Sequence, residues 1–322
     1  MAFRWFIIYC MNKTTKKTIR YIDLFCGIGG FRYAAQDAFK ALGVNGECVF
    51  SSDIDKYAQQ AYKANFGEMP AGDITKIDER ELPDFDVLFG GFPCQAFSIC
   101  GLMAGFEDKT RGTLFFDIAR IIKEKQPRAF VLENVKNLAG HNGGKTLNTI
   151  LDVLRNDLGY YVEYRLLNAL DFGLPQKRER VIIIGAQEPY SMDWSFNIKN
   201  KKTLEDILEK KVEKKYYASD FIITKRKMAH KSHYKPAIWH ENKSGHISSY
   251  PYSCALRAGA SYNYLLVDGE RRLTPREMLR LQGFPDSFEI VTSDCQARKQ
   301  AGNAVPVDMV EAVIERFLPL VL

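Results

Sequence analysis

Short apolar runs alternate with segments of helical periodicity along the first 190 residues of the chain. The runs are of strand length, and between them apolar residues recur every three or four positions. The predicted strands span 19–25, 47–52, 86–89, 128–132, 160–169 and 180–186. The predicted helices span 31–42, 56–65, 114–123 and 146–157. This alternation is typical of an α/β fold with helices on both faces of a mostly parallel sheet.

One predicted strand has no polar alternation. Residues 181–184 read Val-Ile-Ile-Ile, a continuous run typical of a strand that is covered on both faces. This strand is therefore expected in the interior of the sheet.

The pattern changes after Gln187, where the chain becomes lysine-rich and aromatic without a clear period. A helical pattern returns at 274–281, where Thr-Pro-Arg-Glu combines an N-cap, a proline at the first helical position and an acidic first turn. Another follows at 305–317. We therefore predict one large domain from 1–189 and 303–322, a smaller domain from 190–274, and a hinge segment from 275–302.

Charge is concentrated in the smaller predicted domain. Residues 191–240 contain twelve Lys and Arg against six Asp and Glu, a local net charge of +6 that equals that of the whole chain. Basic side chains interleaved with aromatic ones favour a polyanion such as nucleic acid as partner. The alternative for part of this segment is a solvated lysine-rich helix over 203–215. The interleaved aromatic residues are Trp194, Phe196, Tyr216, Tyr217, Phe221, Tyr234 and Trp239.

Seven scattered cysteines argue for a reducing compartment, since they show no paired spacing. The histidines at 230–246 lack the spacing of a zinc site, and we predict no metal. No run approaches the roughly 18 apolar residues that span a bilayer, so a soluble protein is expected. The apolar residues 3–10 lack the flanks of a secretory signal, and Met11 is an alternative start to Met1.

A lone cysteine follows one predicted strand. Asp86-Val87-Leu88-Phe89 leads into Gly-Gly-Phe-Pro-Cys94, and ligands of open α/β sheets bind at the carboxyl ends of the strands. Pro93 stiffens the loop before the thiol. A nucleophile is the functional interpretation of Cys94, and a small buried hydrophobic residue is the alternative.

The first predicted strand runs into a glycine-rich turn, Asp23-Leu-Phe-Cys-Gly-Ile-Gly-Gly30, which lets a ligand approach the backbone closely. Its spacing differs from that of the dinucleotide fingerprint. Asp53, at the end of the second strand, can hold a ribose diol. Asp73, expected at the end of a further strand, can bind the amino group of adenine. Together they predict a cofactor that contains adenosine.

Six motifs in one order give the chain a resemblance to the cytosine-C5 DNA methyltransferases of the short bacterial restriction-modification type. The match covers nearly the whole chain, and 190–270 corresponds to the family's variable target recognition domain. The resemblance implies a Rossmann-like S-adenosylmethionine methyltransferase sheet, mixed but mostly parallel. The motifs are Asp23-Leu-Phe-x-Gly-x-Gly-Gly30, Gly91-Phe-Pro-Cys-Gln95, Glu133-Asn-Val135, Gln176-Lys-Arg-Glu-Arg180, Arg276-Glu277 through Leu281-Gln-Gly-Phe-Pro285, and Gly302-Asn-Ala-Val305.

The chemistry explains these residue types. Cytosine C5 is a poor nucleophile, and a thiolate added to C6 turns the ring into an enamine that can accept the methyl group. The resemblance assigns this thiolate to Cys94 and the carboxyl group beside N3 to Glu133. Arg178 and Arg180 would hold the base O2 and the catalytic loop and favour the thiolate. The base that removes the C5 proton is not identified.

The same resemblance implies binding residues. Enzymes that act on a base flip it out of the duplex, and 96–112 resembles the mobile loop that closes over it. Two departures are visible: Ile54 stands where a Trp often stacks on adenine, and Ala255-Leu256 replaces a Thr-Leu pair. The implied cofactor residues are Phe25, Gly27, Gly29, Gly30, Asp53, Ile54, Asp73, Ile74, Pro93, Asn303 and Val305. The implied base and DNA contacts are Gln95, Ser98, Asn134 and Leu256.

The resemblance therefore implies sequence-specific methylation of duplex DNA by a bacterial, cytoplasmic and nucleoid-associated monomer that binds no membrane. A cognate restriction endonuclease would be its functional partner. The alternatives are a tRNA cytosine-C5 methyltransferase and a DNA-binding regulator without catalysis. The recognised sequence is not readable from residues 190–270.

Overall fold

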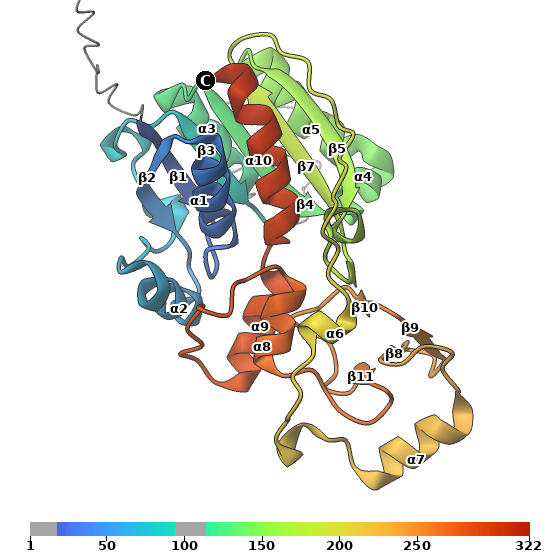
Figure 1. Cartoon of the computed structure of the whole chain (residues 1–322). Coiled ribbons are helices and arrows are strands. Elements are labelled where there is room, and N and C mark those ends of the chain that lie inside the picture. The colour runs from blue at the N-terminus through green and yellow to red at the C-terminus, as the bar shows by residue number, and fades with distance from the viewer. Residues whose placement is uncertain (1–17, 94–113) are drawn as a thin grey trace, which may run out of the picture.

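The computed structural model describes residues 18–93 and 114–322, and its centre is a six-stranded sheet (Figure 1). The strand order is β2-β1-β3-β4-β7-β5. The strands are β1 Thr18–Leu24, β2 Asn45–Ser52, β3 Val87–Gly91, β4 Ala129–Val135, β5 Tyr161–Asn168 and β7 Glu179–Ala186. The predicted strands of the first half are therefore present, with ends that differ by a few residues.

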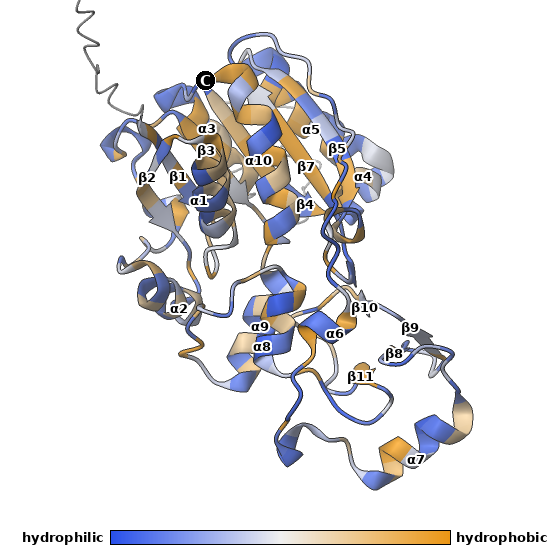
Figure 2. Ribbon diagram, in the orientation of Figure 1, coloured by the Kyte–Doolittle hydropathy of each residue, from blue (hydrophilic) through white to orange (hydrophobic). Residues whose placement is uncertain are grey.

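The sheet is mixed but mostly parallel, as predicted. Strands β2, β1, β3 and β4 pair in parallel, whereas β7 is antiparallel to both β4 and β5. Residues 181–184 of β7 are completely buried, which confirms the interior position expected from the Val-Ile-Ile-Ile run. Strands β4 and β7 are strongly apolar along most of their length (Figure 2).

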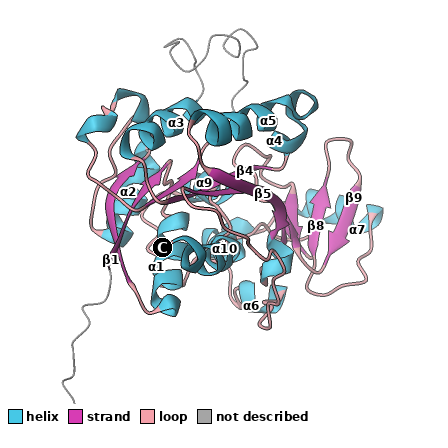
Figure 3. Ribbon diagram, turned by 90° about the horizontal axis from the view of Figure 1, so that it is seen from above, coloured by secondary structure: helices cyan, strands magenta, loops and turns pink. Residues whose placement is uncertain are grey.

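Helices cover both faces of the sheet, as Figure 3 shows from above. On one face α1 (Gly30–Leu42) packs beside α10 (Val307–Val321), and on the other lie α3 (Leu114–Lys125) and α5 (Lys145–Asp152). Helix α2 (Lys56–Phe66) follows β2, and the short α4 (Asn137–Gly140) precedes α5. The sheet thus has two separate apolar cores, one under each helical layer.

The lower part of the molecule in Figure 1 is built mostly from residues after β7, together with the short β6, which precedes β7. A three-stranded antiparallel sheet has the order β11-β8-β9, and β10 pairs with β6 at the junction with the large sheet. These elements are β6 Gln176–Lys177, β8 Ile238–Glu241, β9 Ile247–Tyr250, β10 Ser253–Cys254, β11 Leu265–Val267, α6 Leu204–Ile207, α7 Asp220–Ala229, α8 Pro275–Leu281 and α9 Asp294–Asn303.

Helix α8 has the start that its sequence predicts. The Thr274 hydroxyl accepts a hydrogen bond from the Glu277 amide at 3.2 Å, the Glu277 carboxylate accepts one from the Thr274 amide at 2.9 Å, and Pro275 occupies the first turn. Arg271 adds a buried ion pair to Glu277 at 2.7 Å. This capping box fixes where the chain turns back towards the large sheet.

The segment before α6 departs from the expected domain boundary at 190. Met192 is buried in the core, the Trp194 indole donates to the Glu163 carboxylate of β5 at 2.7 Å, and the Phe196 ring lies 4.8 Å from that of Phe172. These aromatic side chains pack on the large domain instead of facing a polyanion. A boundary near 203 fits these contacts better than one at 190.

Two further expectations require correction. The lysine-rich helix given as an alternative over 203–215 does not form as one element: the segment holds the single turn of α6 at Leu204–Ile207 and a 3₁₀ turn at Lys214–Tyr216. The helix expected over 146–157 changes to π-helical geometry at Val153–Asp157.

Candidate active site

A cavity of about 660 Å³ opens at the carboxyl ends of the parallel strands. The turn after β1, the loop after β2 and the ends of β3 and β4 form one side, and α9 with the residues that follow it forms another. Its lining includes most of the predicted site residues, namely Phe25, Gly27, Gly30, Asp53, Ile54, Asp73, Ile74, Pro93, Glu133, Arg178, Arg180, Asn303 and Val305.

The glycine-rich turn is shaped by backbone conformations that favour glycine. Gly27 and Gly29 have φ angles of 55° and 87°. A Cβ atom at Gly29 would lie 2.2 Å from Cε2 of Phe66, so this residue allows close packing and does not line the cavity. At Gly30 a Cβ atom would lie 2.7 Å from Val305 Cγ2, which brings the start of α1 against the C-terminal motif.

Asp53 is anchored at the end of β2 by backbone donors. Its carboxylate accepts hydrogen bonds from the Gly27 and Asp55 amides, both at 2.8 Å. Burial raises the pKa of Asp53, and the two amide bonds oppose this shift. Each oxygen keeps a free acceptor site, so the carboxylate can also accept from a ribose hydroxyl. Next to it, Ile54 is 71% exposed and offers an aliphatic surface to the cavity.

Asp73 does not end a strand, contrary to expectation. The segment makes only an isolated bridge between Ser52 and Ala71, and Asp73 caps the 3₁₀ turn Ile74–Lys76. One carboxylate oxygen accepts from the Thr75 amide at 3.1 Å and from its hydroxyl at 2.8 Å, and these bonds lower the pKa of Asp73. Asp73 therefore lies at the cavity wall as the N-cap of a short turn and not as the last residue of a strand. Ile74, the next residue, is buried.

Glu133 and Arg180 form an ion pair inside the cavity. The distance from Glu133 Oε1 to Arg180 Nε is 2.5 Å, and both side chains are about nine-tenths buried. Glu133 lies near the end of β4 and pairs in register with Gly91 of β3. A Cβ atom at Gly91 would lie 3.6 Å from Glu133 Oε2. The carboxylate therefore lies beside the strand end that leads to Cys94.

Arg178 makes contacts that sequence reasoning did not foresee. Its guanidinium donates to the carbonyl oxygen of Leu256 at 3.0 Å and to those of Gly302 and Ala304 at 3.0 and 2.7 Å. The side chain is buried, which lowers its pKa to about 9 and leaves it protonated at pH 7. Its terminal nitrogens are engaged by main-chain oxygens and position these segments, whereas its buried Nε has no hydrogen-bond partner among the described residues. The predicted contact of Arg178 with the base O2 stays a prediction.

We call the hydrogen bonds from Arg178 to the carbonyl groups of 256, 302 and 304 the Arg178 clamp, and we expect its loss to destabilise the fold. Arg178→Ala leaves three carbonyl groups without their donor, and we expect the free energy of unfolding to fall by about 3–5 kcal/mol. Urea denaturation measures the change. Arg80→Ala is the control, since its ion pair with Asp78 is 74% exposed on the arginine side and its loss should change the free energy of unfolding little. Equal losses in the two variants would contradict the clamp.

The predicted DNA contacts have mixed outcomes. Asn134 is buried, donates to the Phe92 carbonyl at 2.8 Å, and accepts from the Val135 amide at 2.8 Å, so it fixes the strand end before Pro93. The Leu256 side chain is 4% exposed and its amide donates to Gln176 at 3.0 Å, so a direct contact of this side chain with DNA does not match the arrangement. Cys94, Gln95 and Ser98 lie outside the described residues.

Helix α9 supplies residues that the sequence did not single out. Lys299 and Gln300 line the cavity beside Asn303, one helical turn along the same face. The Lys299 ammonium pairs with Asp55 at 2.6 Å. Gln300 Nε2 is buried and has no hydrogen-bond partner among the described residues. The i, i+4 spacing of Lys299 and Asn303 in a helical stretch could have indicated this face.

The same helix contacts the loop at 257–262. A Cβ atom at Gly302 would lie 2.4 Å from the Ala258 amide nitrogen. Arg298 donates to the Ala260 carbonyl, and its guanidinium carbon lies 4.4 Å from the centre of the Tyr262 ring. Helix α9 therefore touches the cavity on one side and the smaller domain on another.

The cavity fits an adenosine-containing sulfonium cofactor by its donor set. Asp53 offers acceptors for a diol, Gln300 offers an orphaned buried donor, and Lys299 and Asn303 offer partners for a carboxylate. Within the described ranges, no three His, Cys, Asp or Glu side chains gather as a metal site would require. No helix of 18–93 or 114–322 is both long and apolar enough to cross a membrane.

Comparisons with known proteins agree with this geometry. A family model described as C-5 cytosine-specific DNA methylase matches residues 19–318. Type II methyltransferase M.NgoBI of Neisseria gonorrhoeae is 54% identical over 294 residues, 90% of each chain, and M.HaeII of Haemophilus aegyptius is 52% identical over 300 residues, 92% of each chain. The fold is similar to that of the Entamoeba histolytica methyltransferase EhMeth, with a TM-score of 0.71, 17% identity, and coverage of 94% of this chain and 98% of that chain.

Proposed function

The chain belongs to the C-5 cytosine-specific DNA methylase family, and on that premise we propose that the 660 Å³ cavity is its active site. The protein is a DNA (cytosine-5-)-methyltransferase of the type found in restriction-modification systems. Its family and fold imply the use of S-adenosylmethionine. We further propose that it modifies one cytosine within a specific short duplex sequence.

One observation carries the assignment of the site. The buried Glu133–Arg180 pair and the anchored Asp53 carboxylate line one cavity, at the end of the strand that leads to Cys94. A group that binds an adenosine moiety and a group that can protonate a pyrimidine ring are thus brought to the same opening. Methyl transfer to a base requires this proximity.

The proposed mechanism uses two side chains on the base. The Cys94 thiolate attacks C6, which forms a carbon–sulfur bond, breaks the C5–C6 π bond and moves electron density towards N3. The Glu133 carboxyl group, protonated before the attack, gives its proton to N3, and Arg180 holds the resulting carboxylate until the proton returns. S-adenosylmethionine, when bound, would supply an electrophilic methyl group to C5 and leave as the neutral thioether S-adenosylhomocysteine. Loss of the C5 proton then lets the carbon–sulfur bond break and regenerates Cys94.

The cofactor residues follow from the cavity. We assign the ribose hydroxyls to Asp53, the adenine to Ile54, Asp73 and Ile74, and the amino acid end to Asn303. Gly27 supports Asp53 through its amide, while Phe25, Pro93 and Val305 provide apolar surface. Gly29 and Gly30 allow the turn to pack closely beneath the site.

Asp53→Asn tests the ribose assignment. Loss of the charged acceptor is expected to raise the Kd for S-adenosylmethionine by about 10- to 100-fold, because a hydrogen bond to a charged group contributes about 1.5–3 kcal/mol. Isothermal titration calorimetry measures the change. The control is Asp37→Asn, an exposed carboxyl on α1 that does not line the cavity. An unchanged Kd in the Asp53 variant would remove Asp53 from the site.

The DNA would bind across the opening between the large sheet and the smaller domain. We propose residues 203–274 as the target recognition domain and 275–302 as the hinge. The loop 96–112, expected from the sequence to close over the base, lies outside the described residues. Arg257 is the first residue of the loop 257–262 that α9 contacts, and exposed Phe221 and Tyr217 remain available on the smaller domain. A cognate endonuclease, a monomeric state and a cytoplasmic, nucleoid-associated location complete the proposal.

The activity test compares substrates. Purified protein is incubated with methyl-labelled S-adenosylmethionine and duplex DNA, single-stranded DNA or tRNA, and methylation-aware sequencing locates the product. We expect label on C5 of one cytosine in a fixed duplex context. Label confined to tRNA would favour an RNA methyltransferase, and duplex binding without transfer would favour a regulator. Either outcome overturns the proposal.

A further inference from the structure

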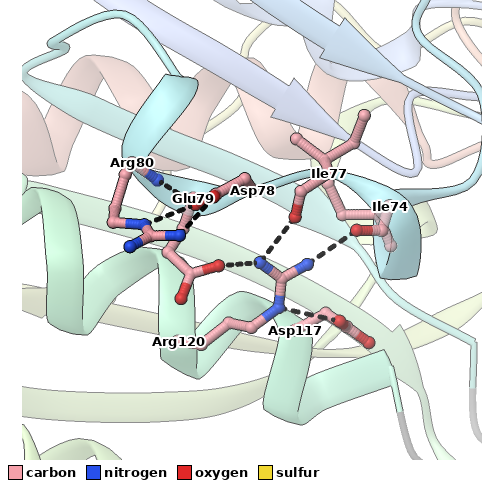
Figure 4. Close-up of polar contacts among 7 residues, drawn as sticks. All are labelled: Ile74, Ile77, Asp78, Glu79, Arg80, Asp117 and Arg120. Carbon is pink, nitrogen blue, oxygen red and sulfur yellow. Dashed lines mark hydrogen bonds and ion pairs between the residues drawn. The ribbon is translucent and has the colours of Figure 1, made fainter.

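We propose that Arg120 is a positioning residue for the adenosine end of the cofactor site, an inference that rests on the proposed function. Arg120 lies on α3 and reaches the segment 73–81, which supplies Asp73 and Ile74 to the cavity wall (Figure 4). It does not line the cavity itself. Its effect on the site would therefore pass through the backbone that it holds.

The wall segment has little regular structure of its own. After Ala71 leaves its bridge with Ser52, the chain forms two 3₁₀ turns, Ile74–Lys76 and Glu79–Glu81, capped by Asp73 and Asp78. Its backbone hydrogen bonds span three residues, such as Ile77 amide to Ile74 carbonyl at 3.2 Å. Local turns of this kind do not fix a segment relative to the sheet.

Ile74 packs in the apolar core with α3, and Arg120 adds a polar connection between this helix and the main chain of the segment. Its Nη2 donates to the Ile74 carbonyl at 2.6 Å and its Nη1 to the Ile77 carbonyl at 2.9 Å. Nη1 also pairs with Glu79, and Nε donates to Asp117 at 3.0 Å (Figure 4). One planar guanidinium thus grips two main-chain carbonyls and two carboxylates.

Helix α3, which carries Arg120, is fixed in place by its packing on the sheet. Ile118, Ile121 and Ile122 are completely buried against the sheet, so the helix cannot shift without disturbing the core. Leu114, at its first position, lines the same cavity. The wall segment and the start of α3 therefore line one cavity, and Arg120 joins them; Lys125 at the other end of α3 adds a hydrogen bond to the Arg80 carbonyl at 3.2 Å.

Arg80, which lies within the wall segment itself, offers a matched comparison with Arg120. Arg80 also makes a bidentate contact, to Asp78 at 2.9 and 2.6 Å, but it is 74% exposed. The Arg120 side chain is 23% exposed. If an ion pair in this segment were enough to affect cofactor binding, replacement of either arginine would weaken it. If the hydrogen bonds to the carbonyls of 74 and 77 are what position the wall, only replacement of Arg120 would weaken it.

The experiment measures cofactor affinity and kinetics in Arg120→Met, Arg120→Lys and Arg80→Met. Arg120→Met is expected to raise the Kd and the KM for S-adenosylmethionine about tenfold, because a small displacement of contacting groups weakens binding. Arg120→Lys keeps the charge but not the fork, and an increase of about threefold is expected. The kcat at saturating cofactor and the KM for DNA should stay within about twofold.

The outcomes separate this inference from the proposed function. Failure of the unaltered protein to bind S-adenosylmethionine would overturn the proposed function. Normal binding by the unaltered protein with equal Kd values for the Arg120 and Arg80 variants would overturn the role of Arg120 alone. A parallel loss of kcat, DNA affinity and thermal stability in Arg120→Lys would make the residue structural and would also overturn it.

Discussion

Cys94→Ser is expected to abolish methyl transfer, with a loss in kcat of at least about 10⁴-fold. A serine hydroxyl is not ionised near neutral pH and is a far weaker nucleophile than a thiolate, so the bond to C6 does not form. Cofactor binding should persist, since Asp53 and the glycine-rich turn are untouched. The measurements are label transfer to duplex DNA and trapping of a covalent adduct on DNA that contains 5-fluorocytosine.

Cys295→Ser is the matched control. Cys295 is an exposed free cysteine on α9, so its replacement should leave turnover and adduct formation near those of the unaltered protein. A covalent adduct that persists in Cys94→Ser, or one that disappears in Cys295→Ser, would move the nucleophile elsewhere.

Glu133→Gln is expected to reduce kcat by about 10²- to 10³-fold. The amide keeps the shape of the side chain but cannot deliver a proton to N3, and general acid–base catalysis commonly contributes an effect of this size. The change also leaves Arg180 without its ionic partner. Single-turnover methyl transfer measures the loss, and the Kd for S-adenosylmethionine should change little because Asp53 is unaltered.

Glu179→Gln serves as the control for this variant. Glu179 stands at the start of β7, one residue before Arg180, and pairs with the half-exposed Lys136 at 2.9 Å. It does not line the cavity. Comparable losses in the two variants would mean that any change of charge at this end of β7 disturbs the enzyme, and Glu133 would lose its assigned role.

The sequence predicts the regular part of the fold well because burial dictates it. The Val-Ile-Ile-Ile run leads to an interior strand, and the Thr-Pro-Arg-Glu start leads to a capped helix. Irregular segments were predicted less well. Asp73 lies on a turn whose position depends on Arg120, 47 residues later in the chain, and no local pattern reports such a contact.

Arg178 and Arg180, two arginines of one motif, show how far the sequence can predict the contacts within the site. Arg178 and Arg180 are separated by one residue, and sequence reasoning gave both a role at the base. In the structure Arg180 pairs with Glu133, whereas Arg178 lies between β6 and β7 and binds carbonyls of 256, 302 and 304. The partners of Arg178 come from distant segments, so only tertiary structure distinguishes the two roles. In the same way, Trp194 and Phe196 have the composition of a nucleic-acid surface but contact Glu163 and Phe172.

The Arg178 clamp has a consequence for how specificity can diversify. Every amino acid carries a main-chain carbonyl, so the hydrogen bonds of the clamp do not themselves depend on the side chains at 256 and 304, which are constrained only by their burial in the core. Gly302 is constrained by the close approach of Ala258. Exposed side chains elsewhere in 203–274 can therefore change while the clamp survives, which would let the proposed target recognition domain diversify without loss of its docking on the large domain.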